Sequence, residues 1–143
     1  MTQAAILQPV FALVAWTFVV LMLIPVARFR SGARGEVAAD DFKSGESARV
    51  PGAVSIPNRN YMNLLEIPML FYVGCIALYA VGNVSSSSLV LAWTYVGLRV
   101  VHSLIHLTYN AVMHRLTAFA VSNFVLAGLW ISLFFAMPGA LPG

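Results

Sequence analysis

The sequence predicts an all-α integral membrane protein, folded as one bundle of four membrane-spanning helices over residues 1–143. First, 60% of the residues are hydrophobic and only 9% are charged, which is too apolar for a soluble domain of this size. Second, several uncharged tracts exceed the roughly 20 residues that a helix needs to cross a bilayer. Third, a segment rich in Gly, Asn and Ser at 82–88 divides the longest tract into two helices.

The four predicted spans cover residues 6–27, 61–81, 89–111 and 116–136, and a long cytoplasmic loop covers residues 28–60. We interpret the first span as a retained anchor, because no basic segment precedes it and its positive charges follow it, unlike those of a secretory signal. The loop mixes Gly, Pro, Ser and charged residues, which is typical of a connection outside the bilayer, with one short amphipathic turn. All four spans belong to a single domain.

The distribution of positive charge predicts the orientation of these spans. The chain has eight Lys and Arg residues, and the termini and the serine-rich segment have none. Those that flank the membrane lie in the long loop or between the last two spans: Arg28, Arg30, Arg34, Lys43, Arg49, Arg59 and Arg115. By the positive-inside rule, both loops are cytoplasmic and both termini lie on the opposite side. A bacterial inner membrane suits this arrangement, although an endoplasmic reticulum protein would follow the same rule.

The formal net charge of +3 therefore reflects membrane topology, and we expect the lipid bilayer as a partner but no nucleic acid. The single cysteine, Cys75, lies within an apolar span and excludes an intrachain disulfide. A thiol buried among apolar side chains is a poor nucleophile, so any thiol chemistry must come from a ligand.

Two polar faces stand out within the spans. Arg99, His102 and His106 follow one another at spacings of three and four, which places them on one face of a helix. Ionisable groups at bilayer depth are costly and face a bundle interior, a partner or a ligand. A second face, at the start of the second span, carries polar groups at spacings of four and three: Arg59, Asn63 and Glu66.

The predicted topology brings both faces to the same level near the cytoplasmic side. We expect Glu66 to accept hydrogen bonds from Arg99 or Arg115 on a neighbouring helix. Together with Arg59, the arginines outnumber this carboxylate, so the site favours an anion. Guanidinium groups hold carboxylates bidentately and Glu66 would accept an amine, which matches a small zwitterion with two carboxylates and one amine.

These motifs resemble the family of membrane-associated proteins in eicosanoid and glutathione metabolism, MAPEG. Arg59, Asn63 and Glu66 reproduce the family's pattern in the second helix, and Arg99, His102 and Arg115 that of the third. The resemblance covers essentially the whole chain. It implies a homotrimer of four-helix subunits that binds glutathione between subunits at the cytoplasmic side. The residues implied to contact glutathione are Arg59, Asn63, Glu66, Arg99 and Arg115.

The resemblance also implies a chemistry. Arg115 would stabilise the glutathione thiolate, which would attack a lipophilic electrophile or a hydroperoxide dissolved in the bilayer. His106 stands where many members have a tyrosine, and would replace it as a hydrogen-bond partner. Leu116 and Phe119 stand where prostaglandin-forming members have serine and tyrosine, which argues against that activity. A glutathione transferase or peroxidase is the leading prediction.

Other interpretations remain open at this stage. Arg59 is also typical of a snorkelling side chain at a helix end, and Asn63 and Glu66 of polar contacts between helices. His102 and His106 share a helical face that could chelate an ion, but the nearby arginines would repel a cation, so no metal site is predicted. The main alternative is a non-catalytic lipid-binding or scaffold subunit of the same family.

Overall fold

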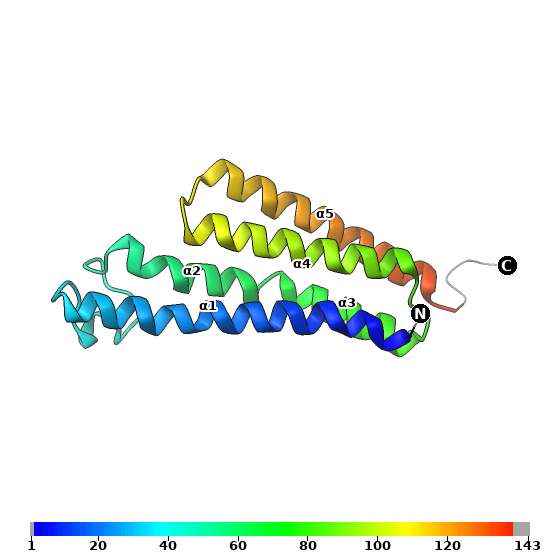
Figure 1. Cartoon of the computed structure of the whole chain (residues 1–143), viewed down its shortest axis with the longest axis horizontal. Coiled ribbons are helices and arrows are strands. Elements are labelled where there is room, and N and C mark those ends of the chain that lie inside the picture. Colours follow the sequence, from blue (N-terminus) through cyan, green and yellow to red (C-terminus); the bar gives the residue numbers. More distant parts are fainter. Residues whose placement is uncertain (1, 139–143) are drawn as a thin grey trace.

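Helices run back and forth along one axis in the computed structural model, which describes residues 2–138 (Figure 1). Short 3-10 turns, η1 and η2, lie at Gln3–Ile6 and Ala39–Phe42. The α-helices are α1 (Leu7–Ala33), α2 (Gly52–Leu65), α3 (Pro68–Val81), α4 (Ser86–Leu107) and α5 (Val112–Ala136).

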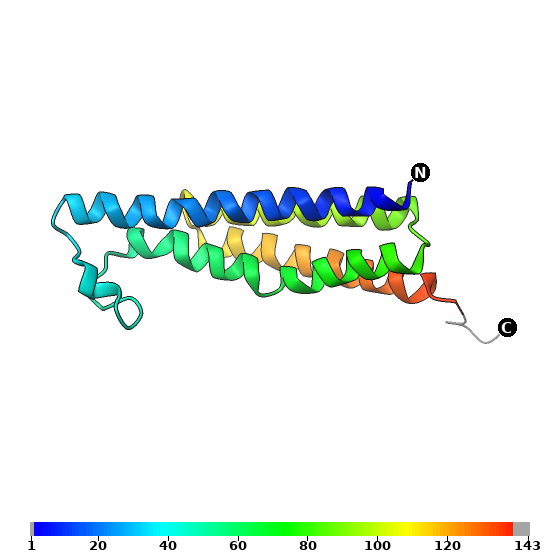
Figure 2. The same cartoon turned by 90° about the horizontal axis from the view of Figure 1, so that it is seen from below.

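Four helical units are long and apolar enough to cross a membrane, which confirms the predicted fold class. They are η1 with α1, α2 continued by α3, α4 alone and α5 alone. The second unit is broken where one helix was expected, because Pro68 has no amide hydrogen and opens α3 at its first position. Glu66 ends α2 with a non-helical backbone (φ −72°, ψ −90°). Figure 2 shows the change of direction at this break.

The helices are longer than the sequence indicated at several ends. α1 continues to Ala33, and α2 begins at Gly52, so the connection is residues 34–51 rather than 28–60. Arginine favours helix, which explains why Arg28 and Arg30 extend α1 instead of ending it. The polar stretch before Tyr61 is helical because one face of it packs inward; the buried residues of α2 are Val54, Ser55, Pro57, Asn60 and Leu64.

The serine-rich segment, predicted as a loop, starts a helix. Ser85 is the N-cap of α4, and its Oγ accepts a hydrogen bond from the amide of Ser88 at 3.1 Å. The Ser88 hydroxyl in turn accepts from the Ser85 amide at 3.0 Å. This reciprocal arrangement satisfies backbone amides that the first turn of a helix leaves free.

Apolar side chains from all helices fill the centre of the bundle. Phe71 of α3 stacks on Tyr95 of α4 with ring centroids 4.7 Å apart, and Cys75 is fully buried beside them in the core cluster. α4 lies along α5, and α1 lies along α2 and α3 (Figures 1 and 2). Large apolar side chains also cover the outside, as expected for a surface that faces lipid; examples are Phe11, Phe18, Phe124 and Phe135.

Asp41 organises the connection between α1 and α2. Its carboxylate accepts hydrogen bonds from the Ala38 amide at 2.9 Å and from the Ser47 hydroxyl at 2.8 Å. These bonds favour the charged form and hold the pKa of Asp41 below its ordinary value of 3.8. The charged carboxylate of Asp41 therefore stabilises the turn from Ala38 to Ser47.

We expect Ser85→Ala to lower the free energy of unfolding by about 1 kcal/mol, because the substitution removes the helix cap. Denaturation by SDS in mixed micelles measures the change. Ser86→Ala is the control, since Ser86 is the first residue of α4 and its side chain is exposed. Equal stabilities of the two variants would contradict the assigned cap.

The loop around Asp41 should lose stability in acid. Because the folded pKa of Asp41 is lowered, its contribution is complete above pH 3.8 and disappears as the pH falls through the folded value. Hydrogen exchange at the Ala38 amide should show this as a falling protection factor. Asp41→Asn should show low protection at every pH, whereas Asp40→Asn, at an exposed residue, should behave as the parent.

Candidate functional site

The polar face predicted on α4 is present and points into the bundle. Arg99 is 0% exposed, and His102 and His106 are each 3% exposed. The two imidazole rings have centroids 6.1 Å apart, and the His102 ring lies 5.8 Å from the ring of Phe119 on α5. The prediction that these three ionisable residues avoid lipid is confirmed.

Arg99 is bound by the backbone of α2. Its Nη2 donates a hydrogen bond to the carbonyl oxygen of Asn63, and its guanidinium carbon lies 5.5 Å from the centroid of Phe119. Asn63 is in the last turn of α2, where carbonyls have no amide of a continuing helix to accept from. The break at Pro68 therefore frees an acceptor for one nitrogen of this buried guanidinium, whereas its buried Nε and Nη1 have no hydrogen-bond partner among residues 2–138.

The predicted ion pair between Glu66 and Arg99 or Arg115 is not formed. Within residues 2–138, salt bridges join Arg28 to Glu46 at 3.4 Å and Arg34 to Glu36 at 4.0 Å. Glu66 is exposed because it follows the last turn of α2, where the chain leaves the helical path. Its carboxylate is thus available to a ligand instead of being neutralised by an arginine.

An open cavity of about 360 Å³ joins the second polar face to the end of α4. Its size is at the lower end of the roughly 300–1,000 Å³ typical of ligand pockets. The residues that line it are Ile56, Asn58, Arg59, Met62, Asn63, Glu66, His106, Asn110 and Arg115. We call this space the α2–α4 cavity.

A smaller cavity of about 240 Å³ lies beside it. Asn63 and Arg115 line both spaces, and the smaller one is otherwise bounded by His102, Val112, Leu116 and Phe119. The structure thus places six of the seven predicted site residues around two adjoining cavities. Arg99 is the exception, since it lies behind their walls and contacts Asn63 and Phe119.

Arg115 is held in place by a residue that the sequence analysis did not identify. The Oδ1 of Asn110 accepts a hydrogen bond from Arg115 Nη1 at 2.7 Å. Asn110 forms the turn between α4 and α5 with a positive φ of 49°, a conformation that Asn adopts more readily than most residues. An Asn near the end of the predicted span 89–111, five residues before an Arg, was the signal available in the sequence.

The charges around the α2–α4 cavity favour an anion that also carries an amine. Arg59 and Arg115 line it with positive charge and Glu66 with negative charge. The side-chain amide of Asn63 donates to the Arg59 carbonyl at 2.9 Å, which leaves its Oδ1 free to accept. In residues 2–138, no group of three His, Cys, Asp or Glu side chains is arranged to hold a metal ion.

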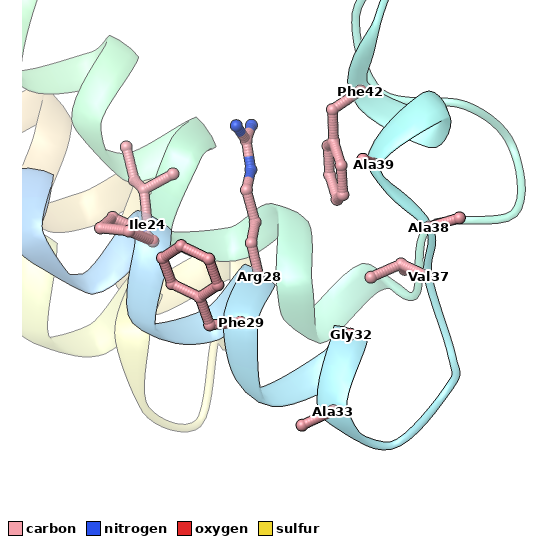
Figure 3. A pocket seen from close by; sticks show the side chains of 10 residues that line it. Ile24, Arg28, Phe29, Gly32, Ala33, Val37, Ala38, Ala39 and Phe42 are labelled. Carbon is pink, nitrogen blue, oxygen red and sulfur yellow. The ribbon is translucent and has the colours of Figure 1, made fainter.

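A cavity of about 500 Å³ that the sequence did not predict lies at the end of α1 (Figure 3). Arg28 stands in it, with its guanidinium carbon 4.4 Å from the centroid of Phe42 and its Nη2 3.4 Å from Glu46. The other lining side chains are apolar. Because Arg28 already has an acidic partner, this cavity is a weaker candidate for an anion than the α2–α4 cavity.

Comparison with known proteins identifies the family. The model of the MAPEG family matches residues 6–135, which is nearly the whole chain. No curated protein and no solved structure matches.

The turn at Asn110 predicts a difference between two substitutions. Asn110→Gly removes the bond to Arg115 but tolerates the positive φ, whereas Asn110→Ala also strains the backbone. We expect the alanine variant to be less stable than the glycine variant by about 1 kcal/mol. Unfolding of both variants in mixed micelles tests this, and equal stabilities would contradict the left-handed turn.

Proposed function

Because the chain belongs to the MAPEG family, we propose that it binds glutathione in the α2–α4 cavity and acts as a glutathione transferase or peroxidase on lipophilic electrophiles. The family includes such enzymes as well as non-catalytic members. The observation that carries the proposal is the gathering of Arg59, Asn63, Glu66 and Arg115 around one open, net positive cavity.

The chemistry of glutathione suits these side chains. A glutathione carboxylate would bind a guanidinium group, which offers paired donors in a planar fork, and the exposed Arg59 is accessible for this. The glutathione amine would donate to Glu66, whose carboxylate has no basic partner among the described residues. The free Oδ1 of Asn63 would accept from a peptide amide.

Arg115 would perform the catalytic role by favouring the thiolate over the thiol. A permanent positive charge beside the sulfur stabilises the negative form, and the bond to Asn110 fixes the guanidinium before the ligand arrives. In a conjugation reaction, the thiolate sulfur forms a bond to the electrophilic carbon and the leaving group departs with its electron pair. The apolar wall of the smaller cavity, formed by Val112, Leu116 and Phe119, would contact the lipophilic partner.

His106 would contribute a hydrogen bond from the wall of the cavity. Its Nδ1 is buried and has no partner in the described part of the chain. The Nδ1 of His102 is also buried without a partner among the described residues, and His102 lines the smaller cavity. Either imidazole would therefore gain a bond from a bound peptide, and His106 stands at the position that carries a tyrosine in many family members.

We further propose a homotrimer in a bacterial inner membrane, with both termini on the non-cytoplasmic side. The Lys and Arg residues at the end of α1 and in the connection to α2 support this orientation, since the positive-inside rule counts these residues and not the net charge. The broad apolar surface of the helices supports contact with lipid and with neighbouring subunits. A non-catalytic, lipid-binding or scaffold protein of the same family is the alternative, favoured by the apolar walls at Leu116 and Phe119.

Calorimetry with glutathione and a conjugation assay, both in detergent, test the proposal. Arg115→Ala should lower turnover about 100-fold, since it removes a charge aimed at the reacting sulfur. Glu66→Ala should raise the Kd about tenfold through loss of a charged hydrogen bond. Arg49→Ala, at an exposed residue outside both cavities, is the charge control.

Two results would contradict the proposal. A parent protein that binds no glutathione would exclude the site itself. Binding without conjugation or peroxide reduction, unchanged by Arg115→Ala, would favour the non-catalytic alternative.

A further inference from the structure

A buried hydrogen bond joins α2 to α4 next to residues that line the two cavities. Asn60 and Ser103 are each 0% exposed. The Nδ2 of Asn60 donates to the Ser103 hydroxyl at 2.6 Å and lies 3.4 Å from the Ser103 carbonyl oxygen. No residue of the polar pattern predicted from the sequence takes part in this contact.

This contact leaves one buried polar atom without a hydrogen-bond partner, which indicates that it has a role besides stabilising the fold. The Oδ1 of Asn60 is buried and has no hydrogen-bond partner among residues 2–138. A buried polar atom without a partner destabilises a fold, so an apolar pair of similar size would pack here at lower cost. Polar side chains kept in such places are known to specify how helices align.

The position of the pair shows what it would align. Asn60 follows Arg59 in α2, and Ser103 follows His102 in α4, so each partner is adjacent to a residue that lines a cavity. One turn further along α2, the Asn63 carbonyl accepts from Arg99. Two polar contacts therefore connect successive turns of α2 and α4.

α2 is a short helix for which a direct contact with α4 matters. It has 14 residues and ends at the break before Pro68. A shift of α2 along α4 would displace Arg59 and Glu66 from the cavity that they line.

We propose that Asn60 and Ser103 are positioning residues, which fix the register of α2 against α4 and so place the ligand-binding groups of α2 opposite those of α4 and α5. The inference rests on the proposed glutathione site for its functional consequence. Its geometric part, the register of the two helices, is independent of any ligand.

The geometric part is tested with spin labels at Leu65→Cys and Leu104→Cys, two exposed positions on α2 and α4, in a Cys75→Ser background. Labelled protein is diluted with unlabelled protein so that distances within one chain dominate. Asn60→Leu should broaden the distance distribution measured by electron paramagnetic resonance. An unchanged distribution would overturn the inference.

The functional part is tested by calorimetry with glutathione. Asn60→Leu and Ser103→Ala should each raise the Kd about tenfold, and the double variant no further, because both remove the same bond. The midpoint of thermal unfolding should stay close to that of the parent. Ser122→Ala is the matched control, since its buried hydroxyl bonds only within α5, to the Phe119 carbonyl.

An exchanged pair, Asn60→Ser with Ser103→Asn, provides the rescue. The exchanged variant should restore the narrow distance distribution and the affinity for glutathione. Separate structural roles of the two side chains would not predict this recovery. A broadened distribution with unchanged affinity in Asn60→Leu would overturn the positioning role. If the unsubstituted protein binds no glutathione, the proposed function is contradicted. The distance distribution alone then tests whether Asn60 and Ser103 fix the register of α2 against α4.

Discussion

The architecture depends on the burial of one cation, Arg99, in a membrane-spanning helix. A charged group at this depth needs compensating polar contacts, and no carboxylate among residues 2–138 forms a salt bridge with it. A backbone carbonyl provides one contact and is free because α2 ends before Pro68, while Nε and Nη1 of Arg99 stay without a hydrogen-bond partner in the described part of the chain. The helix break therefore accompanies the burial of the arginine, because it frees the carbonyl to which the guanidinium bonds.

This constraint explains the location of the cavities. α2 must approach α4 closely enough for the Asn63 carbonyl to meet the guanidinium, yet Pro68 redirects the chain immediately afterwards. Glu66 is left at the opening with its carboxylate exposed. Arg115 enters from α5, held by the turn at Asn110. The result is an open space between α2, α4 and α5 that is lined by two arginines and one carboxylate.

Much of this arrangement could be predicted from helical spacing. The positions of Arg99, His102 and His106 identify one face, and those of Arg59, Asn63 and Glu66 another, because residues three and four apart lie together on a helix. The partners across helices could not be predicted. Spacing does not reveal that Arg99 bonds to a carbonyl instead of Glu66, or that Asn60 meets Ser103, because backbone acceptors and helix registers depend on the packed bundle.

The helix ends were misplaced for a related reason. Polar residues at 52–60 were assigned to a loop, although their buried face is supplied by tertiary contacts. The serines at 85–88 were assigned to a turn, although Ser85 caps α4. Local composition indicates where a chain can leave the bilayer but not where its helices stop.

The ionisable face of α4 also constrains how the protein is made. α4 has the lowest mean hydropathy of the four spanning units, and an arginine at the centre of an isolated helix costs about 2.5–3.5 kcal/mol on insertion. The nascent segment cannot recover this cost from lipid. The carbonyl that Arg99 bonds to belongs to α2, so α4 gains this contact only when α2 lies beside it in the membrane.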